Sequence, residues 1–173
     1  LGQFVTRCAE HISLAIAKVK LRDELHDQSI RDPLTGLYNR RYFMDAMRRE
    51  TVSSDRGEKG FGLISFDADK FKTFSDNHGH EAGNMVLRAL AQRIVAVMPD
   101  DAICVRIGGE EFAIPLPKTD LYDALASAER LRRDVEAIEV RTAFGPLPRV
   151  TISSGVVAHD GGSDPAERFD EAS

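Results

Sequence analysis

Two short apolar runs joined by the tetrapeptide Gly-Gly-Glu-Glu at residues 108–111 constrain the fold of this chain more than any other feature. The first run covers residues 102–107 and the second covers residues 112–116. A Gly-Gly pair between apolar runs of strand length favours a tight β-hairpin, because glycine adopts the positive φ angles that such turns require. The sequence therefore predicts two adjacent strands whose connecting turn carries two glutamates.

The other predicted elements indicate a mixed sheet. Residues 61–66 are typical of a strand buried on both faces that ends at Asp67, and a short polar segment follows it. After residue 30 the predicted order is α, β, α, β, β, α, β. This order suggests an α+β fold of the ferredoxin-like or palm type, a mixed antiparallel sheet with helices on one face. Helices are expected at about residues 40–51, 81–97 and 121–138, a loop at 53–57 and the last strand at 149–157.

Residues 1–30 are expected to form one long N-terminal linker helix. Val5, Ile12 and Val19 recur at intervals of seven, which is typical of the seam of a two-stranded coiled coil. We therefore expect this helix to be a signalling segment at the end of an upstream domain. The alternative is a helix that packs on its own domain.

The boundaries of the second domain follow from turn and capping residues. Pro33 and Gly36 end the first helix, and Asn39 is placed to cap the next one. Residues 31–173 are expected to form this domain. It is expected to be incomplete at the C-terminus, because a domain of this type would usually add a closing helix and strand.

Composition excludes several classes of protein. Acidic residues outnumber basic ones by 28 to 23. This balance argues against a general binder of nucleic acid or anionic membranes, which needs clustered Lys and Arg. Cys8 and Cys104 are too few for a disulfide framework and suit a reducing, cytoplasmic setting. No apolar run approaches the ~20 residues needed to cross a bilayer, although a longer parent protein could still be attached to a membrane.

Three carboxylates stand at turning points of the predicted sheet. Asp67 ends the strand at residues 61–66, and Glu110 and Glu111 occupy the hairpin turn. If these strands are neighbours, the three side chains converge at one end of the sheet, where clustered carboxylates favour a bound cation. Hard oxygen ligands of this kind select Mg²⁺ or Mn²⁺, which in turn recruit phosphates. The alternative is that each acid is merely a solvated residue at a strand end.

Residues 106–112, Arg-Ile-Gly-Gly-Glu-Glu-Phe, resemble the signature of the GGDEF family, the diguanylate cyclases, in its glutamate-containing form. Further stretches resemble the family's opening motif, its metal and nucleotide segments and its late strand, in the family's order. These stretches are residues 32–41, 67–72, 79–83 and 151–155. Several motifs in the right order are far more specific than an isolated Gly-Gly pair.

The resemblance implies an enzyme that condenses two GTP molecules into cyclic di-GMP and releases pyrophosphate. In this family each subunit holds one GTP, and two subunits face each other so that each 3′-hydroxyl attacks the α-phosphorus of the other nucleotide. A homodimer is therefore expected to be required for catalysis. An upstream sensor domain in the same chain is expected to set the distance between the two half-sites.

The resemblance also implies roles for residues of this sequence. Two Mg²⁺ (or Mn²⁺) ions per active site would be held by Asp67, the Ala68 carbonyl and Glu110, with Glu111 contributing or orienting. Glu110 is implied to accept the proton, and Lys72 to stabilise the transition state. The residues implied to contact the nucleotide are Lys70 and Phe71 through their backbone, Ser75, His80 and Asn84, and Gly108 and Gly109 in the hairpin. For His80, fixing the loop before its helix is an equal alternative.

Two positions depart from the family pattern where the base is read. The family has Asn where this chain has Ser75, and Asp where it has Asn84. A carboxylate accepts both donors of guanine, N1–H and the 2-amino group, whereas an Asn amide matches the donor and acceptor of adenine. The sequence therefore predicts relaxed or altered base selectivity. The alternative is that Asn84 binds guanine through one hydrogen bond and water.

Two functions remain open at this point. One is an active diguanylate cyclase, and the other is a catalytically weak or inactive GGDEF domain that acts as a nucleotide-binding regulatory module. Glu110 and Glu111 favour the enzyme, while Ser75 and Asn84 favour the module. Residues 99–102, Pro-Asp-Asp-Ala, lack the Arg of the family's Arg-x-x-Asp product-inhibition site, so feedback by that route is not expected.

Overall fold

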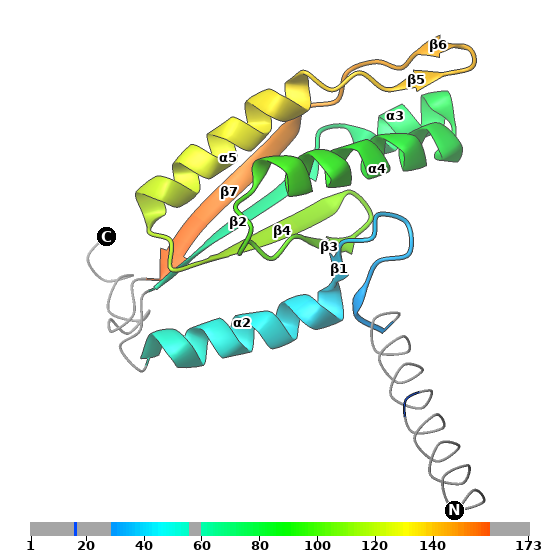
Figure 1. Ribbon diagram of the computed structural model, residues 1–173. Coiled ribbons are helices and arrows are strands. Elements are labelled where there is room, and N and C mark those ends of the chain that lie inside the picture. The colour runs from blue at the N-terminus through cyan, green and yellow to red at the C-terminus, as the bar shows by residue number, and fades with distance from the viewer. Residues whose placement is uncertain (1–15, 17–28, 56–59, 160–173) are drawn as a thin grey trace, which may run out of the picture.

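The computed structural model describes residue 16 and residues 29–55 and 60–159. Figure 1 shows a twisted sheet with helices packed on it. The elements are, in chain order, β1 (Tyr38–Asn39), α2 (Arg40–Asp55), β2 (Phe61–Ala68), α3 (Phe71–His78), α4 (His80–Val97), β3 (Val105–Gly108), β4 (Glu111–Pro117), α5 (Leu121–Glu136), β5 (Arg141–Thr142), β6 (Gly145–Pro146) and β7 (Ile152–His159).

The sheet has mixed topology, as the sequence predicts. Within the described residues its five strands lie in the order β1-β3-β4-β2-β7. Strand β2 pairs antiparallel with β4 and with β7, whereas β1 pairs parallel with β3. The predicted hairpin is confirmed as the antiparallel pair β3–β4, with an irregularity between Arg106 and Gly108. The α+β fold is therefore confirmed.

Helices cover both faces of the sheet, so the expectation of helices on one face is wrong. Helices α4 and α5 lie over one face, while α2 lies on the opposite face (Figure 1). Helix α2 packs on β3 and β4. In the described structure it packs less extensively on β2 and β7. That face is therefore left open beside the C-terminal end of β2, where Ser65 and Asp67 are exposed.

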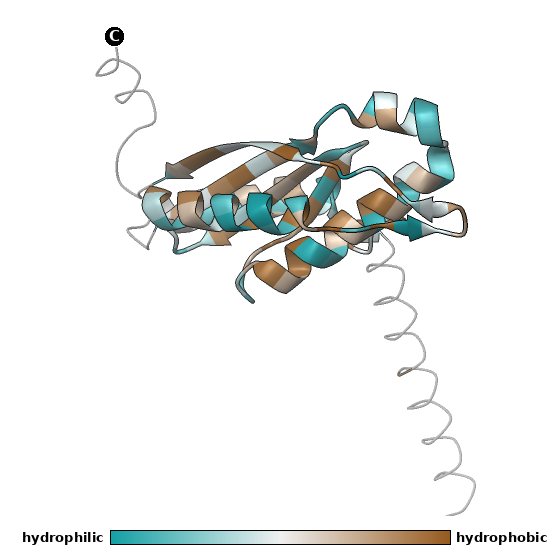
Figure 2. Ribbon diagram, turned by 90° about the horizontal axis from the view of Figure 1, so that it is seen from above, coloured by the Kyte–Doolittle hydropathy of each residue, from teal (hydrophilic) through white to brown (hydrophobic). Residues whose placement is uncertain are grey.

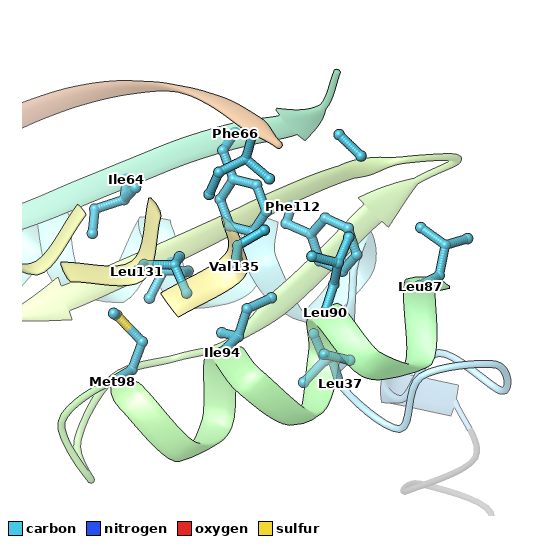
Figure 3. Close-up of a cluster of buried hydrophobic side chains, with 14 of the residues drawn as sticks. Leu37, Ile64, Phe66, Leu87, Leu90, Ile94, Met98, Phe112, Leu131 and Val135 are labelled. Atoms are coloured by element: carbon cyan, nitrogen blue, oxygen red, sulfur yellow. The ribbon is translucent and has the colours of Figure 1, made fainter. Parts of the chain in front are cut away.

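The hydrophobic core fills the space between the sheet and the helices α4 and α5 (Figure 3). Ile64 and Phe112 enter it from the sheet, and Ile94 and Leu131 enter it from the two helices, all four with no exposed surface. Figure 2 shows hydrophobic segments along the strands beneath the helices, whereas α3 is mostly hydrophilic. Burial of such side chains is the main favourable contribution to folding, at roughly 1.5–3 kcal/mol for each large apolar residue.

Several predicted boundaries differ from the structure. Residues 53–55, expected in a loop, belong to α2, while the cap at Asn39 is confirmed, since its Oδ1 accepts the Tyr42 N–H at 3.2 Å. Strand β2 is not buried on both faces, because Ser65 and Asp67 are exposed on the face that α2 leaves open. The last strand begins at Ile152 rather than at residue 149.

Four elements were not predicted, namely β1, α3, β5 and β6. The segment after Asp67, expected to be merely polar, forms helix α3, whose short apolar stripe of Phe71 and Phe74 is a weak periodic signal. Strands β1, β5 and β6 were also missed, because each is only two residues long. These elements were not predicted mainly because they are short, since a hydrophobic period cannot be recognised in so few residues.

The N-terminal helix expected at residues 1–30 lies outside the described residues, apart from helical backbone at Ile16, Ser29 and Ile30. Residues 160–173 also lie outside them. In the part of the chain that is described, no helix combines the length and the apolar character needed to cross a membrane.

A charged contact joins the start of the domain to the β3–β4 hairpin. The Arg106 guanidinium donates to both carboxylate oxygens of Asp32, at 3.0 and 3.2 Å, and to the Gly109 carbonyl, at 2.8 and 3.0 Å. Asp32 also accepts the amide and hydroxyl of Thr35. The side chains of Arg106 and Asp32 are only 13% and 18% exposed. This contact therefore fixes the hairpin turn relative to the segment that enters the domain.

Replacing Asp32 by Asn should destabilise the domain in a pH-dependent way. Burial alone would raise the pKa of Asp32, but hydrogen bonds from Thr35 and Arg106 outweigh it and hold the pKa below its ordinary value of 3.8. The charged form then contributes stability above that value and loses it as the pH falls through the lower folded-state pKa. We expect Asp32→Asn to lower the free energy of unfolding by about 1–3 kcal/mol near neutral pH.

Urea unfolding between about pH 7 and pH 2 measures this effect, and the difference from the unmodified protein should shrink below about pH 4. Asp45→Asn is the matched control, because its pair with Arg48 is exposed and 3.9 Å long. That change should cost less than about 0.5 kcal/mol. A penalty for Asp32→Asn that is equal at every pH would contradict the assignment.

Candidate active site

The carboxylates singled out in the sequence lie at one end of the sheet. Asp67, the second-last residue of β2, is the direct cross-strand partner of Glu111, the first residue of β4. Directly opposed residues of an antiparallel pair project from the same face, with Cβ atoms about 4.5–5.5 Å apart. Both side chains are exposed on the face that α2 leaves partly open. Like charges placed this way repel each other, which favours a cation between them.

Glu110 and Ala68 complete this group. Glu110 occupies the turn just before β4 and is half-buried. Its carbonyl accepts the Ala68 N–H at 3.4 Å, so the hairpin turn touches the end of β2. The four residues expected to hold metal, Asp67, Ala68, Glu110 and Glu111, thus lie on adjoining backbone positions at one end of the sheet.

These residues fit a cation that is bound together with a substrate. Among the described residues, Asp67, Glu110 and Glu111 form no ion pair that would balance their charge. The described structure also gathers no group of three or more His, Cys, Asp or Glu side chains around one point. Mg²⁺ commonly takes one or two carboxylates and completes its shell with water and substrate phosphates, so a preformed protein cage is not required.

The turn after β2 leads from the carboxylates into α3. Lys70 has a left-handed backbone with φ 54°, and α3 begins at the next residue, Phe71. Amide groups in the first turn of a helix have no partner within the helix and can face an anion. Lys70 and Lys72 are exposed on the same turn. The backbone and charge of this turn therefore suit phosphate groups next to the carboxylates.

Asp69 ties this turn to β7. Its carboxylate accepts the hydroxyls of Thr151 and Ser153, at 2.5 and 2.6 Å, and its amide donates to the Thr151 carbonyl at 2.9 Å. The bonds from Ser153 and Thr151 hold the pKa of Asp69 below its ordinary value. The sequence analysis assigned no role to these contacts, although the i, i+2 spacing of Thr151 and Ser153 places two hydroxyls on one face of a strand.

The residues expected around the base lie where α3 meets α4. Ser75 Oγ and His80 Nδ1 are 3.2 Å apart. Asn84 is half-buried one turn into α4. A Cβ added at Gly83 would lie 3.2 Å from the Phe71 ring and 3.4 Å from Ser75 Oγ, so the two helices pack closely. His80 therefore contacts Ser75 of α3, the other residue expected near the base.

The two hairpin glycines leave space beside the turn. Gly109 has φ 53°, and no heavy atom of the described chain lies within 4 Å of a Cβ added at Gly108 or Gly109. Both residues are exposed. A ligand can therefore approach the Cα atoms of this turn closely, whereas the Gly109 carbonyl is already occupied by the Arg106 guanidinium.

The described structure also has a cavity away from these residues. It has a volume of about 560 Å³. Its walls come from residues 31–38, from α4 and from the loop before β3, and they include Arg31, Tyr38 and Cys104. Asp67, Glu110 and Glu111 do not line it, although Asp100 does. Burial raises the pKa of the Cys104 thiol to about 11, so Cys104 is a protonated, partly buried side chain rather than a nucleophile.

Comparison with known sequences gives the same family as the motifs. The profile described as "Diguanylate cyclase, GGDEF domain" matches residues 29–173. Diguanylate cyclase DgcM of Escherichia coli K12 is 34% identical over 150 residues, which is 87% of this chain and 36% of DgcM. Response regulator PleD of Caulobacter vibrioides is 36% identical over 146 residues, or 84% of this chain and 32% of PleD. The chain thus spans about a third of the length of these relatives.

Solved structures agree with this result. The coiled coil and GGDEF domain of DgcB from Caulobacter crescentus, in complex with c-di-GMP, superposes with a TM-score of 0.84 at 25% identity, over 96% of this chain and 88% of the chain in that structure. Diguanylate cyclase SiaD from Pseudomonas aeruginosa, in complex with its activator SiaC, gives a TM-score of 0.76 at 35% identity, over 98% of this chain and 64% of the chain in that structure. The chain therefore belongs to the GGDEF-domain family of diguanylate cyclases.

Proposed function

We propose that this domain condenses two GTP molecules into cyclic di-GMP. The observation that carries the proposal is the pairing of Asp67 with Glu111 beside the Glu110 turn. Among the described residues these acidic groups have no balancing cation, and they lie next to the turn between β2 and α3. A metal nucleotide supplies both the cation and the anion that this arrangement lacks. The alternative, a regulatory module that only binds nucleotide, is favoured by the departures at Ser75 and Asn84.

The residues divide the chemistry between them. Asp67, the Ala68 carbonyl and Glu110 would hold two Mg²⁺ or Mn²⁺ ions, with Glu111 contributing or orienting. When bound, such ions make a hydroxyl easier to deprotonate and offset negative charge at phosphorus. Glu110 accepts the proton of the 3′-hydroxyl, whose oxygen bonds to the α-phosphorus of the other GTP while the bond to pyrophosphate breaks. Two such steps give one cyclic di-GMP and two pyrophosphates.

Positive charge and backbone amides stabilise the phosphates. Lys72 lies in the first turn of α3, where its ammonium group can offset charge in the transition state. The amides at Lys70 and Phe71 would hold the phosphates, and the open backbone at Gly108 and Gly109 would admit the nucleotide.

Catalysis by this domain requires two copies. One site holds one GTP, and the attacking hydroxyl must come from a second nucleotide, so a homodimer places two half-sites face to face. We propose that residues 1–30 are a coiled-coil segment that transmits the state of an upstream sensor domain to residues 31–173. The match to DgcB, whose structure includes a coiled coil, supports this reading. The free thiol at Cys104 suits a reducing cytoplasm.

Replacing Glu110 by Gln should abolish product formation while nucleotide binding persists, because the amide cannot take the proton. We expect the rate to fall by at least about 100-fold. The measurement is mass spectrometry of products after incubation with Mg²⁺ and GTP, ATP or both. Glu139→Gln is the control, since Glu139 forms only exposed pairs with Arg141 and Arg149. Nucleotide binding without product from any mixture, in the unmodified protein, would assign the regulatory module instead.

Replacing Asn84 by Asp should sharpen selection of guanine over adenine. The carboxylate would accept both donors of the guanine edge and would oppose the acceptor N1 of adenine. A bidentate contact of this kind is worth about 1–3 kcal/mol, or a factor of about 5–150 in the ratio of guanine to adenine incorporated. Asn77→Asp adds the same charge on exposed α3 and should leave the ratio unchanged. An equal ratio in both variants would mean that Asn84 does not read the base.

Polar substitution of Ile12 and Val19 should weaken the dimer and the rate together. Both residues belong to the proposed heptad seam of residues 1–30, where apolar contacts would hold two helices in parallel. Sedimentation velocity and the rate per subunit, compared over a range of protein concentrations, measure the two effects. A lower rate that is restored at high concentration is expected. Unchanged assembly and rate would remove the helix from the mechanism.

A further inference from the structure

We infer that Asp69 is a positioning residue, which holds the turn between β2 and α3 in its active shape through the hydroxyls of Thr151 and Ser153. This inference rests on the proposed cyclase function. The group of Asp69, Thr151 and Ser153 is called the β7 clamp below. The clamp would act on the Ala68 carbonyl and on the amides at Lys70 and Phe71, without touching the nucleotide itself.

Three hydrogen bonds join one residue of the turn to the start of β7, since Ser153 belongs to β7 and Thr151 directly precedes it. The two carboxylate oxygens of Asp69 each accept a different hydroxyl, with Thr151 on Oδ2 at 2.5 Å and Ser153 on Oδ1 at 2.6 Å. The amide of Asp69 donates to the Thr151 carbonyl at 2.9 Å. Hydrogen bonds to an ionised acceptor are short and roughly twice as strong as neutral ones. Asp69 is therefore fixed in both its backbone and its side chain.

The clamp lies on the opposite side of Asp67 from Glu111. Strand β2 lies between β4 and β7, and Asp67 faces Glu111 on β4 and Ser153 on β7. The β4 side therefore supplies negative charge, whereas the β7 side supplies hydroxyl donors. Because of this asymmetry, Asp67 and Asp69 have different surroundings although they are only two residues apart. Asp67 has no ion-pair partner among the described residues and suits a cation, while both oxygens of Asp69 are already engaged by β7.

The turn that the clamp supports has an unfavourable backbone. Lys70 adopts φ 54° and ψ 27°, the left-handed region, which is unfavourable for a residue other than glycine. Lys70 is also the N-cap of α3, and its side chain makes no capping hydrogen bond in the described structure. Such a conformation persists only where surrounding contacts enforce it. Because Asp69 directly precedes Lys70, the β7 clamp is placed to enforce it.

The variants Thr151→Val and Ser153→Ala, alone and combined, remove the two donors without altering any carboxylate. Both positions are exposed, so folding should be preserved. Thr151→Ser keeps the hydroxyl and serves as the conservative control. Asp69→Ala, made in the unmodified protein and in the Thr151→Val/Ser153→Ala protein, tests whether Asp69 acts through the hydroxyls.

The main readout is binding of 3′-deoxy-GTP, which lacks the attacking hydroxyl, titrated by calorimetry over a range of Mg²⁺ concentrations. Thr151→Val/Ser153→Ala should raise the Mg²⁺ concentration for half-maximal binding about tenfold, the lower end of the effect of second-shell changes on metal sites. Thr151→Ser should bind as the unmodified protein does, and Asp69→Ala should add little in the doubly substituted background. Amide hydrogen exchange at residues 69–71 should become faster in the doubly substituted protein without any metal or nucleotide.

Three results would overturn the inference. Unshifted Mg²⁺ dependence in the doubly substituted protein, with or without a lower melting temperature, would make the clamp merely structural. A large additional loss from Asp69→Ala in that background would make Asp69 a direct ligand. Absence of Mg²⁺-dependent binding in the unmodified protein would overturn the proposed function and this inference with it. That last result is separate from a failure of the clamp alone, in which the unmodified protein still binds.

Discussion

Strand β2 is hydrogen-bonded on both sides, and its registers with β4 and β7 decide where the functional groups of the domain lie. They set Asp67 opposite Glu111 on one side and opposite Ser153 on the other. A slip of one residue would turn every side chain of the strand to the other face of the sheet. Ile64 and Phe66, which pack in the core beneath α4 and α5, resist such a slip. The buried face thus maintains the site on the open face.

The unequal covering of the sheet leaves this end accessible to solvent. Helix α2 packs on β3 and β4, so Ala113 and Pro115 are buried although they share a face with Glu111. The same face of β2 is open at Ser65 and Asp67. Carboxylates in contact with water keep the access that a metal nucleotide needs. Complete covering by a second helix would have imposed the cost of burying charges without partners.

Arg106 adds a connection that the sheet does not provide. Its guanidinium has five donors in a planar fork, which lets one side chain hold the Asp32 carboxylate and the Gly109 carbonyl at once. The segment of residues 32–36, which precedes β1, is thereby joined to the turn that carries Glu110. This connection passes through one side chain.

The sequence by itself determined the family, the hairpin, the mixed sheet and the identity of the acidic residues, because strong local signals carry them. The Gly-Gly turn, the apolar strand before Asp67 and the Asn39 cap are all readable within a few residues. The structure decided what depends on packing between distant segments. Helix α2 took the second face of the sheet, α3 formed against α4, and Thr151 and Ser153 reached Asp69 from more than 80 positions away. A hydroxyl on a strand and a carboxylate in a turn are ordinary residues in sequence, and only the β2–β7 register turns them into one hydrogen-bonded group.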